Sequence, residues 1–466
     1  MIQSLTLIPP SVSPPLDADF RPISLTNLRF SQQVARDGIP LLIGLERNDG
    51  EISRFEMKIY PEGHPDFDKN YQIVERTIKF LLWQRGGFRI YIGGCKPIGD
   101  FIQKCYSPSG ERAFDYHFMS EQVYERPFEV ITCDPHEIPL AHENGKLIGQ
   151  HLDGCRVGFD LGASDRKASA VIDGKVVYSE EIIWEPRQQS DPEYHYREIM
   201  SAIQSAASKM PRLDAVGGSS AGIYINNRPM VASLFRGIPK NHADQVKNLF
   251  VRIQKELNVP LVVINDGDVT ALAGSMSIGD NAILGIAMGS SEAAGYVNPN
   301  GNIMGWLNEL AFAPIDYNPH APIEEWSGDK GCGASYFSQQ CVFRLAPKVG
   351  IALPLNIPDA EKLLHVQHLL ETGHEGAQKI WETMGVYLGY GIAHYATFYE
   401  LRHVLILGRC TSGKGGTLIL ENAKQVLRTD FPELLERIEI QLPDEKSRRI
   451  GQSIAAASLP VIGKEG

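Results

Sequence analysis

The sequence VGFDLGASDRKASAV, residues 157–171, contains an aspartate and a Gly-Ala-Ser turn between two apolar runs. The apolar runs predict two short strands, and the turn between them predicts a β-hairpin. Gly162 can adopt a positive φ and bring the backbone close to an anion, Ser164 adds a hydroxyl donor, and Asp160 can hold a hydrated Mg²⁺. The pattern indicates either a phosphate-binding hairpin or an ordinary hairpin turn, because both use these residue types.

Three later segments share one organisation, in which an apolar strand ends in a loop of small or polar residues. They are VPLVVINDGDVTALAGS at residues 259–275, ILGIAMGSSEAAGYVNPNGNIMG at residues 283–305, and VLILGRCTSGKGGTLILENAKQVL at residues 404–427. In this order, the four segments resemble those of the ROK (repressor, open reading frame, kinase) family of sugar kinases, within the actin/hexokinase/Hsp70 ATPase superfamily. The resemblance covers about two thirds of the chain, from about residue 155 to the end.

The resemblance implies an α/β fold with two lobes of the actin-like ATPase (ribonuclease H-like) type. ATP with Mg²⁺ and a sugar are then expected in the cleft between the lobes. The implied divisions are an additional α+β domain at residues 1–150, lobe I at 151–275, lobe II at 276–445, and a C-terminal helix at 446–466 that returns to lobe I.

The Asn265-Asp266 pair follows a predicted buried strand, and residues at the end of such a strand are rigidly aimed. Transfer of a phosphoryl group to a hydroxyl requires the hydroxyl held in line, its proton accepted and the phosphate charge neutralised. In the resembled family the aspartate of an Asn-Asp pair is the general base and the asparagine contacts sugar hydroxyls, so the resemblance assigns these roles to Asp266 and Asn265. On its own, the pair is also compatible with a strand-ending turn.

The resemblance also implies three nucleotide-binding loops. Their matching residues are Asp160, Gly162 and Ser164 in the first loop, Gly289, Ser290 and Ser291 in the second, and Gly408 and Ser412 in the third, with Asp160 as the Mg²⁺ ligand. All three loops have fewer glycines than the family pattern, and two of the substituted residues leave alternatives open. Glu292 either faces the triphosphate and repels it or points to the other face of its strand, and Arg409 either stacks on a purine ring or blocks it.

A sugar-binding segment is implied by Asn-Glu-Leu-Ala-Phe at residues 308–312, which lies where the family has Gly-Glu-Ile-Gly-His. Glu309 is therefore expected to bind sugar hydroxyls. The sequence Glu324-Glu325-Trp326-Ser327-Gly328 resembles the glutamate and Ser-Gly that close the family's sugar site. Either Glu324 or Glu325 contacts sugar, or both belong to a solvated acidic turn.

The residues of the family's structural zinc site are not matched. Phe312 stands in place of a histidine ligand, and Cys332 and Cys341 have no third thiol near them. A tetrahedral site requires four ligands, so we expect no zinc.

Composition limits the possible partners and compartment. The chain has 466 residues, and 45 basic against 56 acidic residues give a net charge of −11, which argues against nucleic-acid binding. No run approaches the roughly 18 apolar residues of a membrane span, and the opening residues lack a signal-peptide pattern. Seven scattered cysteines without a framework suggest reduced thiols and a cytoplasmic protein. The expected partners are a sugar and a nucleotide, and a homo-oligomer is compatible with the sequence.

Two functional hypotheses follow. Retention of Asp160, Asp266 and Glu309 favours an ATP-dependent kinase that acts on a hexose or related sugar. The loss of glycines from the phosphate loops, together with the N-terminal addition, favours a non-catalytic sugar sensor or regulatory protein with the same fold. For residues 1–150, with their strand-rich pattern, we found no chemistry-bearing motif and expect an oligomerisation or lid role.

Overall fold

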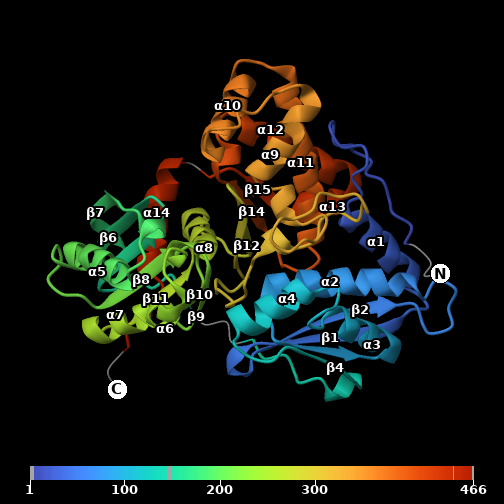
Figure 1. Ribbon diagram of the computed structural model, residues 1–466, viewed down its shortest axis with the longest axis horizontal. Helices are drawn as coiled ribbons and strands as arrows, with labels where there is room; N and C mark the ends of the chain where they lie inside the picture. Colours follow the sequence, from blue (N-terminus) through green and yellow to red (C-terminus); the bar gives the residue numbers. More distant parts are fainter. Residues whose placement is uncertain (1–4, 144–147, 444, 464–466) are drawn as a thin grey trace. The chain divides into compact units, whose positions relative to one another are not determined.

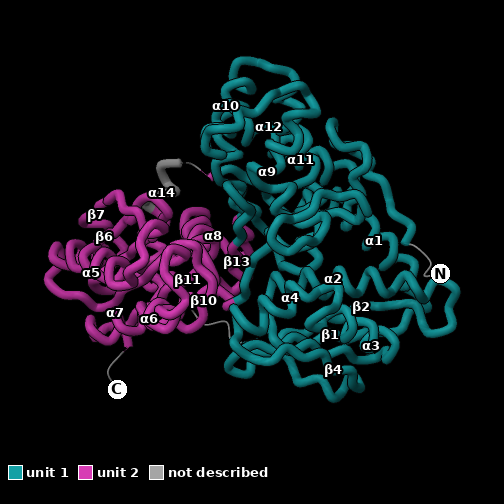
Figure 2. Tube along the Cα trace, in the orientation of Figure 1, with its two compact units in different colours: residues 1–144, 286–294, 306–442 teal, residues 145–285, 295–305, 443–466 magenta. Residues whose placement is uncertain are grey.

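A computed structural model describes residues 5–143, 148–443 and 445–463. Its contacts divide the chain into two compact units (Figure 2). Unit 1 comprises residues 1–144, 286–294 and 306–442, and unit 2 comprises residues 145–285, 295–305 and 443–466. The N-terminal region and a large later part of the chain thus belong to one unit, while the boundaries expected near residues 150, 275 and 445 stay predictions.

The secondary structure alternates between strands and helices along the chain (Figure 1). The strands are β1 (Ile39–Glu46), β2 (Ile52–Ile59), β3 (Arg89–Gly93), β4 (Glu129–Cys133), β5 (Cys155–Leu161), β6 (Asp165–Ile172), β7 (Lys175–Ile183), β8 (Ala215–Ser220), β9 (Ile223–Ile225), β10 (Arg228–Val231), β11 (Leu261–Asn265), β12 (Ile283–Met288), β13 (Glu292–Val297), β14 (His403–Leu407) and β15 (Glu439–Gln441). The α-helices are α1 (Ile23–Val34), α2 (Lys69–Arg85), α3 (Lys96–Cys105), α4 (Ala113–His117), α5 (Pro192–Ala207), α6 (Ala243–Lys247), α7 (Leu249–Leu257), α8 (Asp266–Ile278), α9 (Gln339–Leu345), α10 (Asp359–Glu371), α11 (Glu375–Tyr395), α12 (Lys414–Asp430), α13 (Pro432–Arg437) and α14 (Glu445–Ala457).

Unit 2 is built on a five-stranded sheet with the order β11-β8-β5-β6-β7. β8 pairs in parallel with β5 and with β11, whereas β6 and β7 continue as antiparallel hairpins. In the register of the parallel strands, Asp160 lies opposite Ser219 and Asn265 lies opposite Ser220. Because the carboxyl ends of parallel strands meet at the same edge of a sheet, these four residues share one edge.

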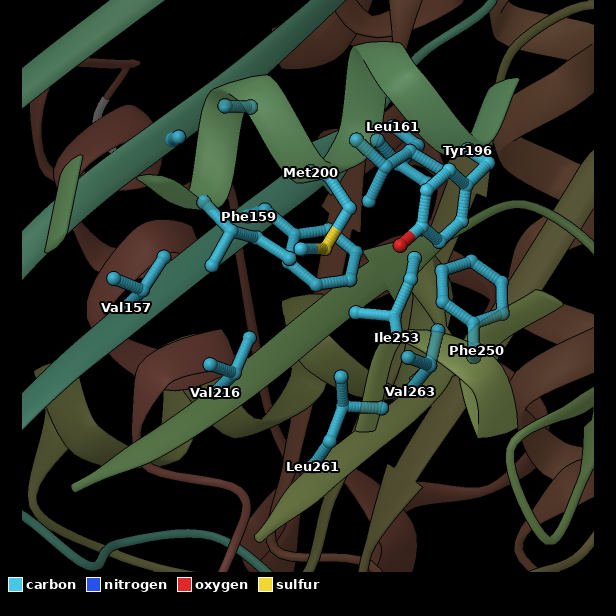
Figure 3. Packing of buried hydrophobic residues seen from close by; sticks show 14 of the residues in the cluster. Val157, Phe159, Leu161, Tyr196, Met200, Val216, Phe250, Ile253, Leu261 and Val263 are labelled. Atoms are coloured by element: carbon cyan, nitrogen blue, oxygen red, sulfur yellow. The ribbon is translucent and has the colours of Figure 1, made fainter. Parts of the chain in front are cut away.

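Helices cover both faces of this sheet. On one face, apolar residues of β5, β8 and β11 pack against α5 and α7, as Figure 3 shows for Phe159, Met200 and Phe250. On the other face, α8 and α14 form a second apolar cluster. A Cβ at Gly217 would lie 1.6 Å from the Ala456 carbonyl oxygen, so glycine is required for α14 to pack directly on β8. The last three residues of the expected C-terminal helix, 464–466, lie outside the described residues.

The N-terminal part of unit 1 is a four-stranded sheet with the order β2-β1-β3-β4. β1 is antiparallel to β2 and β3, and β3 is parallel to β4. Helix α2 is buried along most of its length, and its Phe80 stacks on Phe398, with ring centroids 4.1 Å apart. This sheet and its helices confirm the α+β expectation for the N-terminal region.

A second sheet, with the order β13-β12-β14-β15, lies mainly in unit 1. The long helix α11 is buried, as its apolar sequence predicts. Cβ atoms at Gly385 and Gly389 would lie 2.6 Å from Asn422 Cβ and 2.5 Å from Val426 Cβ, so these glycines allow α12 to approach α11 closely. In the described part of the chain, no helix has the length and apolarity that a membrane crossing requires.

Candidate functional site

Two carboxyl groups meet at the carboxyl edge of the unit 2 sheet. Asp160 is the last residue but one of the central strand β5, and its Oδ1 accepts a 2.7 Å hydrogen bond from the Ser219 hydroxyl on β8. Burial raises the pKa of Asp160. Asp266 begins α8, directly after β11, and the charge of Asp160 contributes to its electrostatic environment. The parallel register thus brings together two residues that are far apart in the sequence.

Asp266 has a perturbed acidity. Its side chain is only partly exposed, and burial followed by the like charge of Asp160 raises its pKa to about 6. Hydrogen bonding from Gly267 opposes this rise, because the amide stabilises the ionised form. At neutral pH Asp266 is therefore ionised, yet it is a stronger base than an ordinary aspartate, which suits a group that accepts a proton.

Asn265 caps α8. Its Oδ1 accepts a 2.7 Å hydrogen bond from Gly267 N, and its Nδ2 donates a 2.8 Å hydrogen bond to the Gly222 carbonyl. An asparagine side chain at this position satisfies a backbone N–H that the first helical turn leaves free. The amide still has one donor and one acceptor position available, and its orientation is set by the two bonds.

The hairpin after Asp160 differs from the prediction in one respect. Gly162 does not use the left-handed region of φ, so the expected positive φ is wrong. A Cβ at this position would lie 2.9 Å from the Asp165 carbonyl oxygen, so limited space within the hairpin favours glycine here. Ala163 and Ser164 at the tip are exposed, and the Trp184 indole donates to the Gly162 carbonyl, which supports the turn from the side.

The carboxylate of Asp160 is the group at this edge that could serve as a ligand of a cation. Among the described residues, no group of three or more His, Cys, Asp or Glu side chains is able to hold a metal ion. Mg²⁺ that accompanies a nucleotide typically takes one or two carboxylates together with phosphate oxygens and water. Asp160 Oδ1 is bonded to Ser219, and the second oxygen of the same carboxylate matches such a ligand.

In unit 1, two predicted nucleotide loops lie side by side. Gly408 follows β14 with φ 101°, and a Cβ there would lie 2.5 Å from the carbonyl oxygen of Met288, the last residue of β12. This close approach requires glycine. It brings the Gly408–Ser412 turn next to Gly289. The side chains of Ser290, Ser291 and Ser412 are exposed, so their hydroxyls are accessible.

Glu292 follows the second loop, and its side chain points into unit 1. It is 3% exposed, and its carboxyl accepts a 2.9 Å hydrogen bond from the Tyr395 hydroxyl of α11. A Cβ at Gly333 would lie 2.0 Å from Glu292 Oε2, so the glycine makes room for the carboxyl. Burial raises the pKa of Glu292 to about 8, with a smaller contribution from Glu309. The alternative in which Glu292 faces away from the loop is therefore the correct one.

Glu309 begins a short 3-10 turn, Leu310–Phe312, in unit 1. The preceding residue, Asn308, has φ 50°, and its side chain accepts a 2.9 Å hydrogen bond from the Tyr399 hydroxyl. The backbone N–H of Glu309 donates to the Trp83 carbonyl of α2, at 3.0 Å. The charge of Glu309 makes a small contribution to the raised pKa of Glu292.

The two glutamates of the later turn differ from each other. The carboxylate of Glu324 accepts hydrogen bonds from the backbone N–H groups of Trp326 and Ser327, at 3.1 and 2.6 Å, and so closes its own loop. Glu325 is exposed. A sugar contact by either residue stays a prediction.

Three residues at the unit 2 edge were not among the predicted site residues. Ser219 donates a hydrogen bond to Asp160 across the parallel pair of β5 and β8. Asp268 accepts a 3.1 Å hydrogen bond from Tyr296 N, and a Cβ at Gly295 would lie 2.1 Å from the Gly267 backbone. These contacts pack β13 against the first turn of α8 and so support Asp266. They join distant segments and leave no local sequence signal.

Several solved structures are similar to this chain in fold. The chain resembles a ROK hexokinase from Thermus thermophilus with 17% identity over 65% of this chain and 98% of that chain, with a TM-score of 0.51. It also resembles a ROK family transcriptional regulator, a homologue of the E. coli Mlc protein, with 18% identity over 66% of this chain and 79% of that chain, with a TM-score of 0.50. A ROK family glucokinase from Streptomyces griseus in complex with glucose and AMPPNP matches with 18% identity over 65% and 99% of the two chains, with a TM-score of 0.47.

A search of curated proteins finds no match. A family model described as ROK family matches residues 156–456, which is more than half of the chain. This match and the Thermus structure confirm the actin-like ATPase fold, and the N-terminal region lies outside the matched residues. The chain belongs to the ROK family.

Proposed function

We propose that this protein transfers the γ-phosphoryl group of ATP to a hydroxyl of a hexose or a related sugar, with Asp266 as the general base. The observation that carries this proposal is the environment of Asp266. Its carboxyl lies at the carboxyl ends of the parallel strands of the unit 2 sheet and has a pKa of about 6, so it is ionised at neutral pH and still basic enough to accept a hydroxyl proton.

The neighbouring side chains support this role. Asn265 is held by two hydrogen bonds and retains a donor and an acceptor position, with which it can orient a sugar hydroxyl toward Asp266. Asp266 would take the proton from that hydroxyl as the oxygen attacks phosphorus. Glu309, with its backbone held by α2, would bind further sugar hydroxyls as a hydrogen-bond acceptor.

The proposed cofactor is ATP with Mg²⁺, which supplies the phosphoryl group and a cation that neutralises phosphate charge. In unit 2, Asp160 would hold Mg²⁺, and Gly162 and Ser164 would bind phosphate. In unit 1, the residues that would bind the nucleotide are Gly289, Ser290, Ser291, Gly408 and Ser412. The buried position of Glu292 supports this assignment, since its carboxyl points to Tyr395.

A non-catalytic sugar sensor is the second candidate. It is favoured by the resemblance to the ROK transcriptional regulator, which extends over 66% of this chain. A sensor needs the sugar-binding residues and not a general base, so the raised pKa of Asp266 favours the kinase.

The deciding experiment measures ADP release by the full-length protein with Mg-ATP and D-glucose, D-mannose or N-acetylmannosamine. Sugar and nucleotide binding are measured by calorimetric titration in the same preparation. The kinase releases ADP only when a sugar substrate is present. A protein that binds sugar and shows no affinity for Mg-ATP is the sensor.

A further inference from the structure

The segment that carries Glu309 is held by helix α2, which lies outside the residues matched by the family model. The N–H of Glu309 donates to the Trp83 carbonyl at 3.0 Å, and the N–H of Asn308 donates to the Gln84 carbonyl at 2.9 Å. Both carbonyls belong to the last turn of α2, where carbonyl groups have no partner within the helix. The end of α2 therefore fixes two successive peptide N–H groups, those of Asn308 and Glu309.

The side chain of Trp83 holds the same segment from a second direction. It is fully buried, and its ring stacks on Phe312 with centroids 4.3 Å apart and an interplanar angle of 30°. Its indole N–H donates a 2.9 Å hydrogen bond to Asp115 Oδ1. Stacking in a packed interior leaves a ring little freedom to shift, so the position of Trp83 determines that of the turn after Glu309.

A buried ionic network extends this support to the loop that carries Glu324. Asp329 accepts from Arg76 and Arg112, each at 2.8 Å, and lies 3.3 Å from Lys79 Nζ. The carbonyl of Asp329 in turn accepts a 2.7 Å hydrogen bond from Glu324 N. Because the charges are removed from water, the loss of one partner would leave another buried and unpaired. The loop is thereby tied to the N-terminal region.

We propose that α2 and the segment around Asp115 are a positioning element of the sugar site, through which residues outside the family match determine sugar affinity. Trp83 is the central positioning residue, since its carbonyl holds Glu309 and its ring holds Phe312. This inference rests on the proposed role of Glu309 in binding sugar. It assigns the N-terminal region an indirect part in recognition of the substrate, through the position of Glu309.

The test compares two matched variants of the full-length protein. Trp83→Phe keeps a ring against Phe312 but removes the donor to Asp115 and reduces the stacked area. Trp381→Phe is the control, because Trp381 is also fully buried in unit 1 and its indole donates a 2.8 Å hydrogen bond to the Cys410 carbonyl. Each variant loses one buried hydrogen bond, so their thermal stabilities should fall by similar amounts.

We expect Trp83→Phe to raise the dissociation constant of the sugar by about three- to tenfold, because a small misplacement of a binding group has a large effect. Trp381→Phe should leave that constant within about twofold of wild type. The probes are D-glucose, D-mannose and N-acetylmannosamine, measured by calorimetric titration without nucleotide. Equal weakening by both variants would mean general destabilisation and would overturn the inference.

A second variant tests the contact from its other side. Phe312→Leu should also weaken sugar binding, and the double variant should weaken it by less than the product of the two single effects, because both changes disrupt one contact. If wild type binds a sugar and all these variants bind it equally well, this inference is wrong while the proposed function stands. If wild type neither binds nor phosphorylates any of the three sugars, the proposed function and the inference both fail.

Discussion

The hydroxyl of Tyr395 donates a 2.9 Å hydrogen bond to the carboxyl of Glu292, and this contact turns an acidic side chain next to the second predicted phosphate loop into the interior of unit 1. The raised pKa of about 8 leaves the carboxyl mostly neutral at pH 7. Glu292 departs from the glycine-rich family pattern of this loop. Because its side chain packs inside unit 1, this departure does not place a charge on the exposed side of the loop.

Replacement of Glu292 by glutamine should change stability and its pH dependence, with no change in nucleotide affinity. The folded state raises the pKa of Glu292 from 4.5 to about 8, so it binds the proton more tightly than the unfolded chain does. The resulting stabilisation is complete below pH 4.5 and is lost as the pH rises through 8. The melting temperature of Glu292→Gln minus that of wild type should therefore increase between pH 6 and pH 9. Exposed Glu325→Gln is the control, and weaker ATP binding by Glu292→Gln would contradict the buried orientation.

Asp266→Asn should abolish most of the turnover. The substitution keeps the shape of the side chain but removes the proton acceptor, so we expect kcat to fall by about 10²–10⁴ with little change in the dissociation constant of the sugar. Steady-state kinetics and calorimetric titration check the two parts. Asp244→Asn, at an exposed position of α6, should keep wild-type activity. Full activity of Asp266→Asn would remove this residue from the mechanism.

The pH profile of kcat/KM should show an acid limb near pH 6. A general base must be ionised, so activity is present above the pKa of Asp266 and is lost as the pH falls through about 6. Asp160→Asn removes the like charge and should move the limb to lower pH, whatever its effect on the rate itself. A limb that stays in place in this variant would show that the two carboxyls do not interact.

Gly295→Ala should impair catalysis without altering any group that touches a ligand. The new Cβ would lie 2.1 Å from the backbone of Gly267, so the turn that carries Asp266 must shift. We expect kcat to fall by up to about 10²-fold, and the free energy of unfolding to decrease by about 1–3 kcal/mol.

Gly451→Ala is the matched control for this experiment. This glycine lies within α14, and its new Cβ would make only ordinary contact with Ala273, at 3.6 Å. Alanine in a helix should raise stability by about 0.5–1 kcal/mol and leave activity unchanged. Wild-type kinetics of Gly295→Ala would show that the close approach of β13 does not support Asp266.

Much of the fold could be predicted because its signals are local. Apolar runs and turn residues within about ten positions of each other predict the strand before Asp160 and the hairpin after it. The same kind of signal predicts the strand that ends at Asn265. The apolar sequence of α11 is likewise a local signal of a buried helix, and its glycines allow the close contact with α12. The N-terminal sheet followed from strand-like runs, although no motif indicated what it packs against.

The sequence by itself determined where the strands lie, and therefore that Asp160 lies near the end of one strand and Asp266 directly after another. Tertiary structure decided how those groups behave. The register of β5, β8 and β11 brings the two carboxyls to one edge, and burial with like charge raises the pKa of Asp266. The direction of Glu292 depends on Tyr395, 103 residues later, and the support of Glu309 depends on Trp83. Desolvation and contacts between distant segments exist only once the chain has folded, so no local pattern could encode them.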